Sequence, residues 1–502
     1  MTPEPGIVSL LPVAVALVVA IGSRNVLLGL FVGLAAGVGL LHGPDPLALV
    51  AVMVKDHLVP QLSDGYNAGV LVLLAFIGGF VALMERSGGG AAFAVRVTHL
   101  LTTRVRLQVS AWLGGIMIFF SDLGTPLIVG PVFRPLADRL RMSRVKLAYI
   151  IDSTASPVAI LVPFIGWGVY IMSLLEQQFQ ALGVDQSDYA ALLAAMPFQF
   201  YAWLAIALVP LLALSGVDVG PMARAERLAR AGEEPRGPEL PTADAPVPGA
   251  RASFVWIPLV VLGLTLTWML VPLGFPFERI SGADFRAGLS TAYLAAAFVL
   301  MALMALSGTR RWLASVQVYL EGMSRMMQVA VMLVLAWALG DVGAMLGTPE
   351  YVAGVAAAGV APWQLPVLLF LLAGVISFAT GSSWGTFAIM MPLALPAAVM
   401  IGAPLPVCIA AVLSGGLFGD HSSPISETTI LSATGAGADQ FGHFQTQLPY
   451  ALGNGLLGAL GFIAAGMYPQ PWILLVLLAV QLAVVVAVRS LRTHQEAVLA
   501  TS

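Results

Sequence analysis

Residues 351–419 contain no Asp, Glu, Lys or Arg, and this run of 69 residues constrains the fold more than any other part of the chain. The run ends at the polar segment 420–429, whose sequence is DHSSPISETT. A helix that crosses the hydrocarbon core needs about 20 mainly apolar residues, so the run is long enough for more than one crossing. Acidic side chains at membrane depth are costly and usually line a path for ions or protons. The segment 420–429 is therefore the first candidate for a functional site.

The whole chain shares this apolar character. Of its 502 residues, 59% are hydrophobic and 10% are charged, whereas roughly 25% of the residues in soluble domains are charged. A soluble fold could not hide so much apolar surface in one core. We therefore expect an all-α polytopic protein of the cell membrane (the inner, or cytoplasmic, membrane), with about 10 to 13 transmembrane segments in contact with the lipid bilayer. The net charge of −3 indicates no nucleic-acid partner.

A polar segment divides the chain into two halves. Residues 216–252 mix Arg with Glu and Asp and include several prolines, which indicates a solvated linker. The predicted divisions are N-terminal membrane helices at 1–64, a first repeat at 65–215, the linker at 216–252, connecting membrane helices at 253–322, a second repeat at 323–465, and a C-terminal helix and tail at 466–502.

The two halves repeat the same kind of polar interruption. Residues 152–157 (DSTASP) and 420–424 (DHSSP) each place an Asp and a hydroxyl run before Ser-Pro. Upstream, residues 121–126 (SDLGTP) and 377–386 (SFATGSSWGT) interrupt other apolar stretches, some of which are too short to cross a membrane alone. Paired interruptions at matching places predict two inverted-topology repeats with broken helices or re-entrant hairpins, and a binding site where they meet.

The Ser-Pro pairs predict how the helices break. Proline disfavours helix at the preceding residue but fits the first position of a new helix, and serine is a favoured N-cap. We expect one helix to end near Gly419 and the next to begin at Pro424 with Ser423 as its cap. Ser156 would cap a helix that begins at Pro157 in the same way. Unwound backbone offers carbonyl oxygens to a cation, and the new helix offers its positive end to an anion.

Four carboxylates are candidates for binding protons and cations: Asp122, Asp152, Asp420 and Glu427. A carboxylate in a low dielectric can take up a proton or hold a cation, but not both at once. Oxygen ligands suit Na⁺, and Asp420, Ser423 and Glu427 form the candidate set for it. Further candidates for ion or substrate binding surround the interruptions: Thr125, Ser153, Thr154, Ser156, Thr380, Gly381, Ser382, Ser383, Trp384, His421, Ser422, Ser423, Ser426, Thr428 and Thr429.

Other residues favour structural roles. Glu85 lies next to Arg86 and predicts an ion pair at the edge of a loop, whereas Asp341 is compatible with either a structural or a functional role. Cys408 lies in an apolar run and predicts a small buried side chain. The chain has neither the G-x-x-x-x-G-K-[ST] motif of ATPases nor the H-E-x-x-H motif of zinc enzymes. We therefore expect no enzyme activity and no cofactor.

Four stretches resemble the NhaC-type Na⁺/H⁺ antiporter family, part of a broader ion-transporter group: the motif around Asp122, and residues 146–157, 377–386 and 418–429. The resemblance spans roughly residues 65–465 and implies two inverted repeats, sites at crossing broken helices, and exchange of Na⁺ for H⁺.

The sequence departs from the family pattern at several positions. Ser121-Asp122 stands where the family usually has an acidic pair, and Ile165-Gly166 stands where it tends to have Ser-Ser. Ser423 and Glu427 stand where the family often has Cys and usually has Asp. The changes in the first half weaken the case for Na⁺ coordination there.

The leading interpretation is a secondary transporter that exchanges protons for Na⁺ or Li⁺ at buried carboxylates, so Na⁺ and H⁺ are the expected transported or coupling ions. The alternative keeps the fold but carries an organic anion or an amino acid with Na⁺ or H⁺. The resemblance allows this alternative, because related families include such carriers. A small carboxylate or an amino acid would then be the partner, and a homodimer is a candidate assembly.

Overall fold

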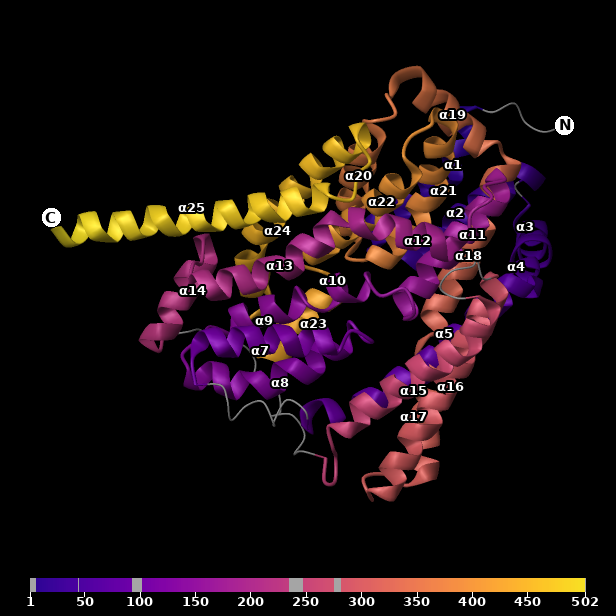
Figure 1. The fold of residues 1–502 in the computed structure, drawn as a ribbon. Coiled ribbons are helices and arrows are strands. Elements are labelled where there is room, and N and C mark those ends of the chain that lie inside the picture. Colours follow the sequence, from indigo (N-terminus) through magenta and orange to yellow (C-terminus); the bar gives the residue numbers. More distant parts are fainter. Residues whose placement is uncertain (1–5, 44, 93–101, 234–246, 275–280, 502) are drawn as a thin grey trace.

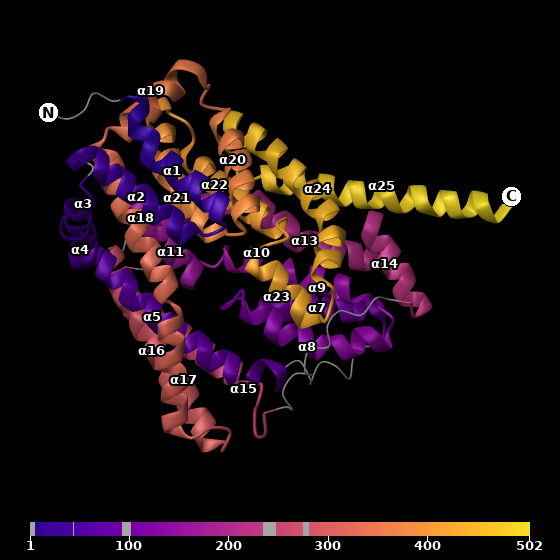
Figure 2. The same ribbon diagram turned by 180° about the vertical axis from the view of Figure 1, so that it is seen from behind.

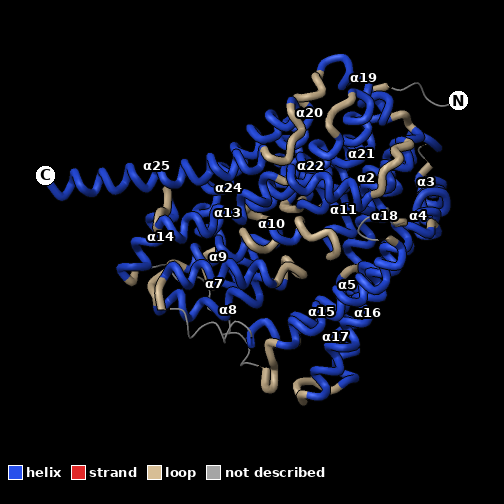
Figure 3. Tube along the Cα trace, in the orientation of Figure 1, coloured by secondary structure: helices blue, strands red, loops and turns tan. Residues whose placement is uncertain are grey.

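The computed structural model describes residues 6–43, 45–92, 102–233, 247–274 and 281–501, and every regular element in these ranges is a helix (Figures 1 and 3). The helices of the first half are α1 (Leu11–Ser23), α2 (Val26–His42), α3 (Pro46–Val52), α4 (Val59–Ser63), α5 (Gly65–Arg86), α7 (Arg104–Met117), α8 (Gly124–Arg139), α9 (Arg144–Asp152), α10 (Ser156–Ala159), α11 (Gly166–Leu182), α12 (Asp188–Ala195), α13 (Phe200–Ser215) and α14 (Gly220–Ala231).

The second half continues with α15 (Ser253–Leu270), α16 (Gly282–Leu306), α17 (Trp312–Arg325), α18 (Met327–Met345), α19 (Thr348–Gly359), α20 (Leu365–Thr380), α21 (Ser383–Ile401), α22 (Leu405–His421), α23 (Glu427–Ala436), α24 (Gln440–Met467) and α25 (Ile473–Thr501). Short turns of tighter or wider helix join some of these elements: Ile7–Leu10, Met53–Leu58, Met196–Phe198 and Val271–Leu273.

Within the described residues, seven helices or joined helices are long and apolar enough to cross a membrane, and the number rises to nine if each of two bent pairs is one span. Three shorter apolar helices, Ile7–Ser23, Leu365–Thr380 and Leu405–His421, fall below the length limit of that count. The expected range of 10 to 13 is reached only if these short helices are included, because breaks in the chain divide several apolar stretches into short helices. The protein is thus a multi-pass membrane protein.

The helices form two groups that both views of the molecule separate (Figures 1 and 2). In one group, α5 packs against α16 and α17, and α15 packs against α16. In the other group, α7, α8, α9 and α23 pack on one another, and α24 covers α9 and α23. The helices α20, α21 and α22 pack together and contact both α24 and the N-terminal helices α1 and α2.

Local backbone chemistry explains why the chain breaks where it does. α20 ends at Thr380 and is followed by Gly381, whose φ of 67° lies in the left-handed region that glycine tolerates best. α21 then begins, and the Ser382 side chain accepts a hydrogen bond of 3.2 Å from the Gly385 amide. At the α7–α8 turn, the Ser121 hydroxyl accepts the Gly124 amide at 2.8 Å. At each of these two turns, a serine side chain therefore accepts a hydrogen bond from a free backbone amide at the start of the next helix.

Part of the predicted linker is an ordered helix. Residues 220–231 form α14, which packs against α24. Its Glu226 is buried, accepts the Ser143 amide at 2.7 Å and pairs with Arg104 at 3.0 Å. At least one charged residue of this stretch therefore has a structural role, because Glu226 connects α14 to the start of α9. Residues 234–246 lie outside the described part of the chain.

Candidate functional site

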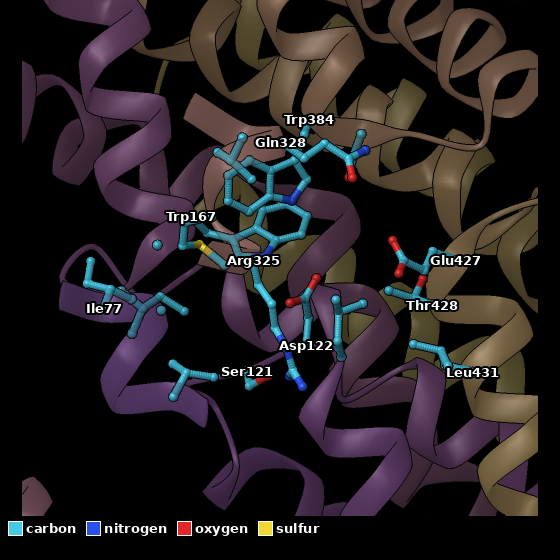
Figure 4. Close-up of a pocket in the computed structure, with 18 of the residues that line it drawn as sticks. Ile77, Ser121, Asp122, Trp167, Arg325, Gln328, Trp384, Glu427, Thr428 and Leu431 are labelled. Carbon is cyan, nitrogen blue, oxygen red and sulfur yellow. The ribbon is translucent and has the colours of Figure 1, made fainter. Parts of the chain in front are cut away.

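A cavity of about 620 Å³ lies where the two helix groups meet. Its walls come from α5, the turn between α7 and α8, the start of α11, the α17–α18 junction, the turn between α20 and α21, and the break between α22 and α23 (Figure 4). Elements of both sequence halves thus contribute to one cavity. This agrees with the expectation that the paired interruptions meet.

Three of the four predicted carboxylates line this cavity. Asp122 lies in the turn between α7 and α8 and is half-buried, and its carboxylate projects into the cavity (Figure 4). Asp420 lies in the last turn of α22, is buried, and accepts a hydrogen bond from the Ser383 hydroxyl at 3.3 Å. Glu427 is the first residue of α23 and is exposed. The expectation that all of the carboxylates are buried is therefore wrong for Glu427.

Hydroxyls and aromatic rings complete the cavity wall. Ser426 and Thr428 line the cavity beside Glu427, and their hydroxyl oxygens lie 3.0 Å apart. The rings of Trp167 and Trp384 meet edge to face, with centroids 5.2 Å apart. The Tyr170 hydroxyl donates to the Trp384 carbonyl at 2.7 Å, which fixes the start of α21 against α11. The cavity therefore offers oxygen ligands on one side and flat apolar surfaces on another.

Two charged residues of the cavity wall were not among the candidates from sequence. Arg325 is the one basic side chain among the lining residues, and it pairs with Glu85 at 3.4 Å. Glu85 also accepts a hydrogen bond of 2.8 Å from Ser121, next to Asp122. The predicted pair of Glu85 with Arg86 is wrong, because Arg86 pairs with Glu321 at 2.6 Å instead. No local signal could predict the Glu85–Arg325 pair, since it joins residues 240 positions apart.

Asp152, the fourth predicted carboxylate, lies outside the cavity wall. It is buried at the end of α9 and accepts hydrogen bonds from Thr429, at 3.3 Å, and Gln447, at 2.6 Å. The Nε2 atom of His421 lies 3.8 Å from its carboxylate. Ser153 belongs to the same neighbourhood, since its hydroxyl lies 3.4 Å from His421. The predicted residues therefore separate into two places.

The predicted residues Gly381 and Ser382 also line the cavity, whereas the remaining candidates neither line it nor hydrogen-bond to Asp152. Several direct their hydroxyls to backbone carbonyls of the preceding helical turn, a common arrangement for Ser and Thr in helices. This holds for Thr125, Thr154, Thr380 and Ser422. The Ser156 hydroxyl is buried without a hydrogen-bond partner among the described residues. The Ser423 hydroxyl donates to the Phe378 carbonyl at 2.8 Å, so it holds the α22–α23 break against α20.

The predicted helix boundaries at the breaks are wrong by a few residues. α22 continues past Gly419 to His421, and α23 begins at Glu427 with Ser426 as its N-cap residue. Pro424 lies in a turn that is closed by the Ser426 amide, which donates to the Ser423 carbonyl at 3.4 Å. α10 begins at Ser156 itself, with Ala155 before it, so Ser156 is not its cap. The later start of α23 places its amino end, rather than the proline, at the cavity.

Glycine permits the close contact between these elements. A side chain at Gly381 would approach the Ile425 carbonyl to 2.8 Å, so the α20–α21 turn rests directly on the α22–α23 break. Residues 381–385, GSSWG, match the G-x-S-x-G pattern of serine hydrolases, so the expectation that the chain lacks this nucleophile motif is wrong. In those enzymes the serine follows a strand and bonds a histidine, whereas Ser383 begins a helix and donates to Asp420. The match carries no catalytic arrangement here.

Comparison with known proteins agrees with this architecture. Residues 158–467 match the model of the Na⁺/H⁺ antiporter family. An uncharacterised protein of Haemophilus influenzae is 30% identical over 474 residues, which cover 91% of this chain and 90% of that protein. The malate-2H⁺/Na⁺-lactate antiporter of Bacillus subtilis is 33% identical over 140 residues, covering 26% of this chain and 29% of the antiporter. The crystal structure of the Alcanivorax borkumensis YdaH transporter shares the fold, with a TM-score of 0.56 at 16% identity, and covers 86% of this chain and 91% of that one.

Proposed function

Because this chain belongs to the Na⁺/H⁺ antiporter family, we propose that it exchanges Na⁺ for H⁺ across the cytoplasmic membrane, with the cavity carboxylates as the ion-binding groups. The observation that carries this proposal is the meeting of three carboxylates on one cavity, from two separate breaks in the chain: Asp122 from the α7–α8 turn, and Asp420 and Glu427 from the α22–α23 break. Carboxylate and hydroxyl oxygens are the ligands that hard cations such as Na⁺ prefer.

The chemistry of exchange follows from competition at these groups. A carboxylate in a low dielectric holds a proton or a cation, but binding of one disfavours the other. Asp420 is the central group, because it is buried and also lies within reach of the Ser383 hydroxyl. Glu427 is more exposed, so it is placed to meet the ion at the mouth of the cavity. Release of Na⁺ would then leave Asp420 free to take up a proton.

Exchange across the membrane also needs the cavity to open to each side in turn. In carriers with repeated, broken helices, one group of helices moves against the other around a fixed site. The contacts of this chain support such a division, because α5 and α17 bring Glu85 and Arg325 to the cavity while the α7–α8 turn brings Asp122. The Ser121–Glu85 hydrogen bond crosses that boundary and would have to break during the movement.

The test uses purified protein in liposomes that contain a pH-sensitive dye. With a pH gradient imposed, Na⁺, Li⁺ and K⁺ are added in turn, and we expect proton movement with Na⁺ or Li⁺ and a smaller response with K⁺. Asp185→Asn serves as a control variant, because Asp185 is exposed and does not line this cavity. A wild-type protein that responds to none of the three cations would overturn the proposal.

A second candidate is exchange of an organic ion at the same site. Two observations favour it: the cavity of about 620 Å³ is far larger than a single cation needs, and Trp167, Trp384 and Arg325 line it. Arg325 could hold a carboxylate, and the indole rings could cover an apolar body. The partial similarity to an antiporter of malate and lactate is consistent with this candidate.

Thermal stabilisation separates the two candidates. A ligand that binds the folded state raises the melting temperature in proportion to the logarithm of its concentration. Stabilisation by a small carboxylic acid or an amino acid, lost in Arg325→Gln but kept in the exposed variant Arg311→Gln, would favour the organic ion. Stabilisation by Na⁺ and Li⁺ alone would favour cation–proton exchange.

A further inference from the structure

Asp152 is the centre of a buried polar cluster that the cavity does not include. Its carboxylate accepts hydrogen bonds from Thr429 and Ser432 of α23, each at 3.3 Å, and from Gln447 of α24 at 2.6 Å. The Nε2 atom of His443, also in α24, lies 3.5 Å from the same carboxylate. Asp152 and His443 have relative exposures of 1% and 0%, so neither side chain reaches bulk water.

His443 is the member of this cluster whose presence needs an explanation. Neither of its ring nitrogens has a hydrogen-bond partner among the described residues, although the side chain is completely buried. Most buried polar groups are hydrogen-bonded, and an exception in a native fold often has a functional cause. The Asp152 carboxylate is the nearest acidic group to this imidazole, so a proton that enters the cluster can be shared between the two side chains.

The surroundings of the pair contain further titratable groups. His421 lies 3.8 Å from Asp152 by its Nε2 atom, and its Nδ1 atom lies 2.8 Å from the Tyr201 hydroxyl. Tyr149 lies one turn before Asp152 in α9, and Asp420 is near enough to interact with Asp152 electrostatically. The Gln447 amide also donates to the His421 carbonyl at 2.6 Å, so it holds Asp152 against the end of α22.

The cluster is separate from the cavity but touches it through one helix. Thr428 lines the cavity, whereas its neighbour Thr429 donates to Asp152. Ser432, one turn further along α23, also faces Asp152. A change of charge at Asp152 therefore acts directly on α23, whose amino end carries Glu427 into the cavity.

We propose that Asp152 and His443 form a second proton-binding centre, distinct from the cavity, which carries the coupling proton while the exchanged ion binds at Asp420 and Glu427. This inference rests on the proposed function and changes one part of it, because proton and cation then occupy different groups. The proton reaches Asp152 or the His443 ring without displacing a cation directly. α23 couples the two sites, since it contacts both.

The first experiment measures ion binding and proton movement separately in Asp152→Asn. Asparagine mimics the protonated acid, which α23 couples to the cation site, so Na⁺ should still raise the melting temperature but should need about fivefold or higher concentration to do so. Na⁺-driven proton movement in liposomes should fall by more than about tenfold, because the centre has lost its acid. Loss of Na⁺ stabilisation together with transport, or proton movement equal to wild type, would overturn the inference.

His443→Gln tests the role of the imidazole, because glutamine keeps polar atoms near Asp152 but cannot bind a proton. We expect exchange to persist, with the midpoint of its pH profile moved toward higher pH, because the imidazole that favours the charged form of Asp152 is gone. A purely structural histidine would lower the melting temperature and leave this midpoint unchanged, which would contradict the proposal. His42→Gln is the matched control, because His42 is exposed at the end of α2.

Infrared difference spectra between low and high pH make the test independent of the transported ion. A carboxylic acid band present in wild type and absent in Asp152→Asn would show proton binding at Asp152 even if wild-type liposomes fail to respond to any cation. Such a result would reject Na⁺/H⁺ exchange as the function. It would still support Asp152 and His443 as the proton-binding centre of a transporter that exchanges another ion. An identical set of bands in both proteins would show that Asp152 binds no proton in this pH range, which would overturn the proposed proton-binding centre. If Asp152→Asn does not insert, the pH profile of His443→Gln decides the question.

Discussion

Asp152 is the last residue of α9 and Asp420 lies in the last turn of α22, each just before one of the two repeated breaks, yet only Asp420 lines the cavity. Asp420 accepts from Ser383 of α21, whereas Asp152 accepts from Thr429, Ser432 and Gln447 and lies among buried histidines. The same local sequence motif therefore places its aspartate in a different environment in each half of the chain. This asymmetry is the basis on which the cation and proton roles can be tested separately.

Asp420→Asn should abolish exchange while the protein remains folded and inserted. The substitution is nearly isosteric, keeps a polar group beside Ser383 and removes the buried charge that the proposed exchange requires. Transport in liposomes and the elution profile in detergent measure the two effects. Asp185→Asn, an exposed carboxylate in a loop, should retain full transport, and an active Asp420→Asn would exclude this residue from the mechanism.

Glu427→Gln should weaken Na⁺ binding by about tenfold, equivalent to about 1.4 kcal/mol, with little loss of stability, because the side chain is exposed. The acid also lies in the first turn of α23, where a negative charge contributes only about 0.3–1 kcal/mol to a helix. The Na⁺ concentration for half-maximal exchange measures the effect. Glu350→Gln is a matched control, since Glu350 is an exposed acid in the first turn of α19, away from the cavity.

Gly130→Ala should destabilise the protein by about 1–3 kcal/mol through overpacking. A Cβ atom at this position in α8 would collide with the backbone carbonyl of Gly435 in α23, and backbone cannot move aside as a flexible side chain can. The thermal melting midpoint in detergent measures the loss. Gly453→Ala in α24 is the control, because no atom lies within 4 Å of its added Cβ, and it should leave the melting midpoint unchanged or raise it.

Lys146→Met should destabilise the protein by about 3–5 kcal/mol, because it leaves the Asp218 carboxylate buried without its charged partner. The Lys146 ammonium and Asp218 carboxylate lie 2.5 Å apart, with relative exposures of 3% and 6%. The double variant with Asp218→Asn should recover much of the melting temperature, since the uncompensated charge is gone. A double variant no more stable than the single one would indicate that packing, rather than charge, explains the loss.

Much of the local structure could be predicted from sequence. The breaks near Gly381, Pro157 and Pro424 depend on backbone conformations that glycine and proline impose by themselves. The predicted starts of α10 and α23 were wrong because serine can serve either as a turn residue or as a helix cap. Only the contacts around the serine decide which of the two roles it takes. At Ser423 that contact is the Phe378 carbonyl of α20, 45 residues away.

The sequence by itself determined that the chain is helical, lies in a membrane, and is interrupted by acidic and hydroxyl-rich breaks, because apolar run length, charge and proline act over short distances. The tertiary structure decided which polar groups share a site. It separated Asp152 from Asp420, placed Glu85 and Arg325 at the cavity, and brought His443 to Asp152. These relationships depend on how distant helices rotate and pack against one another, and no spacing along the chain encodes that rotation locally.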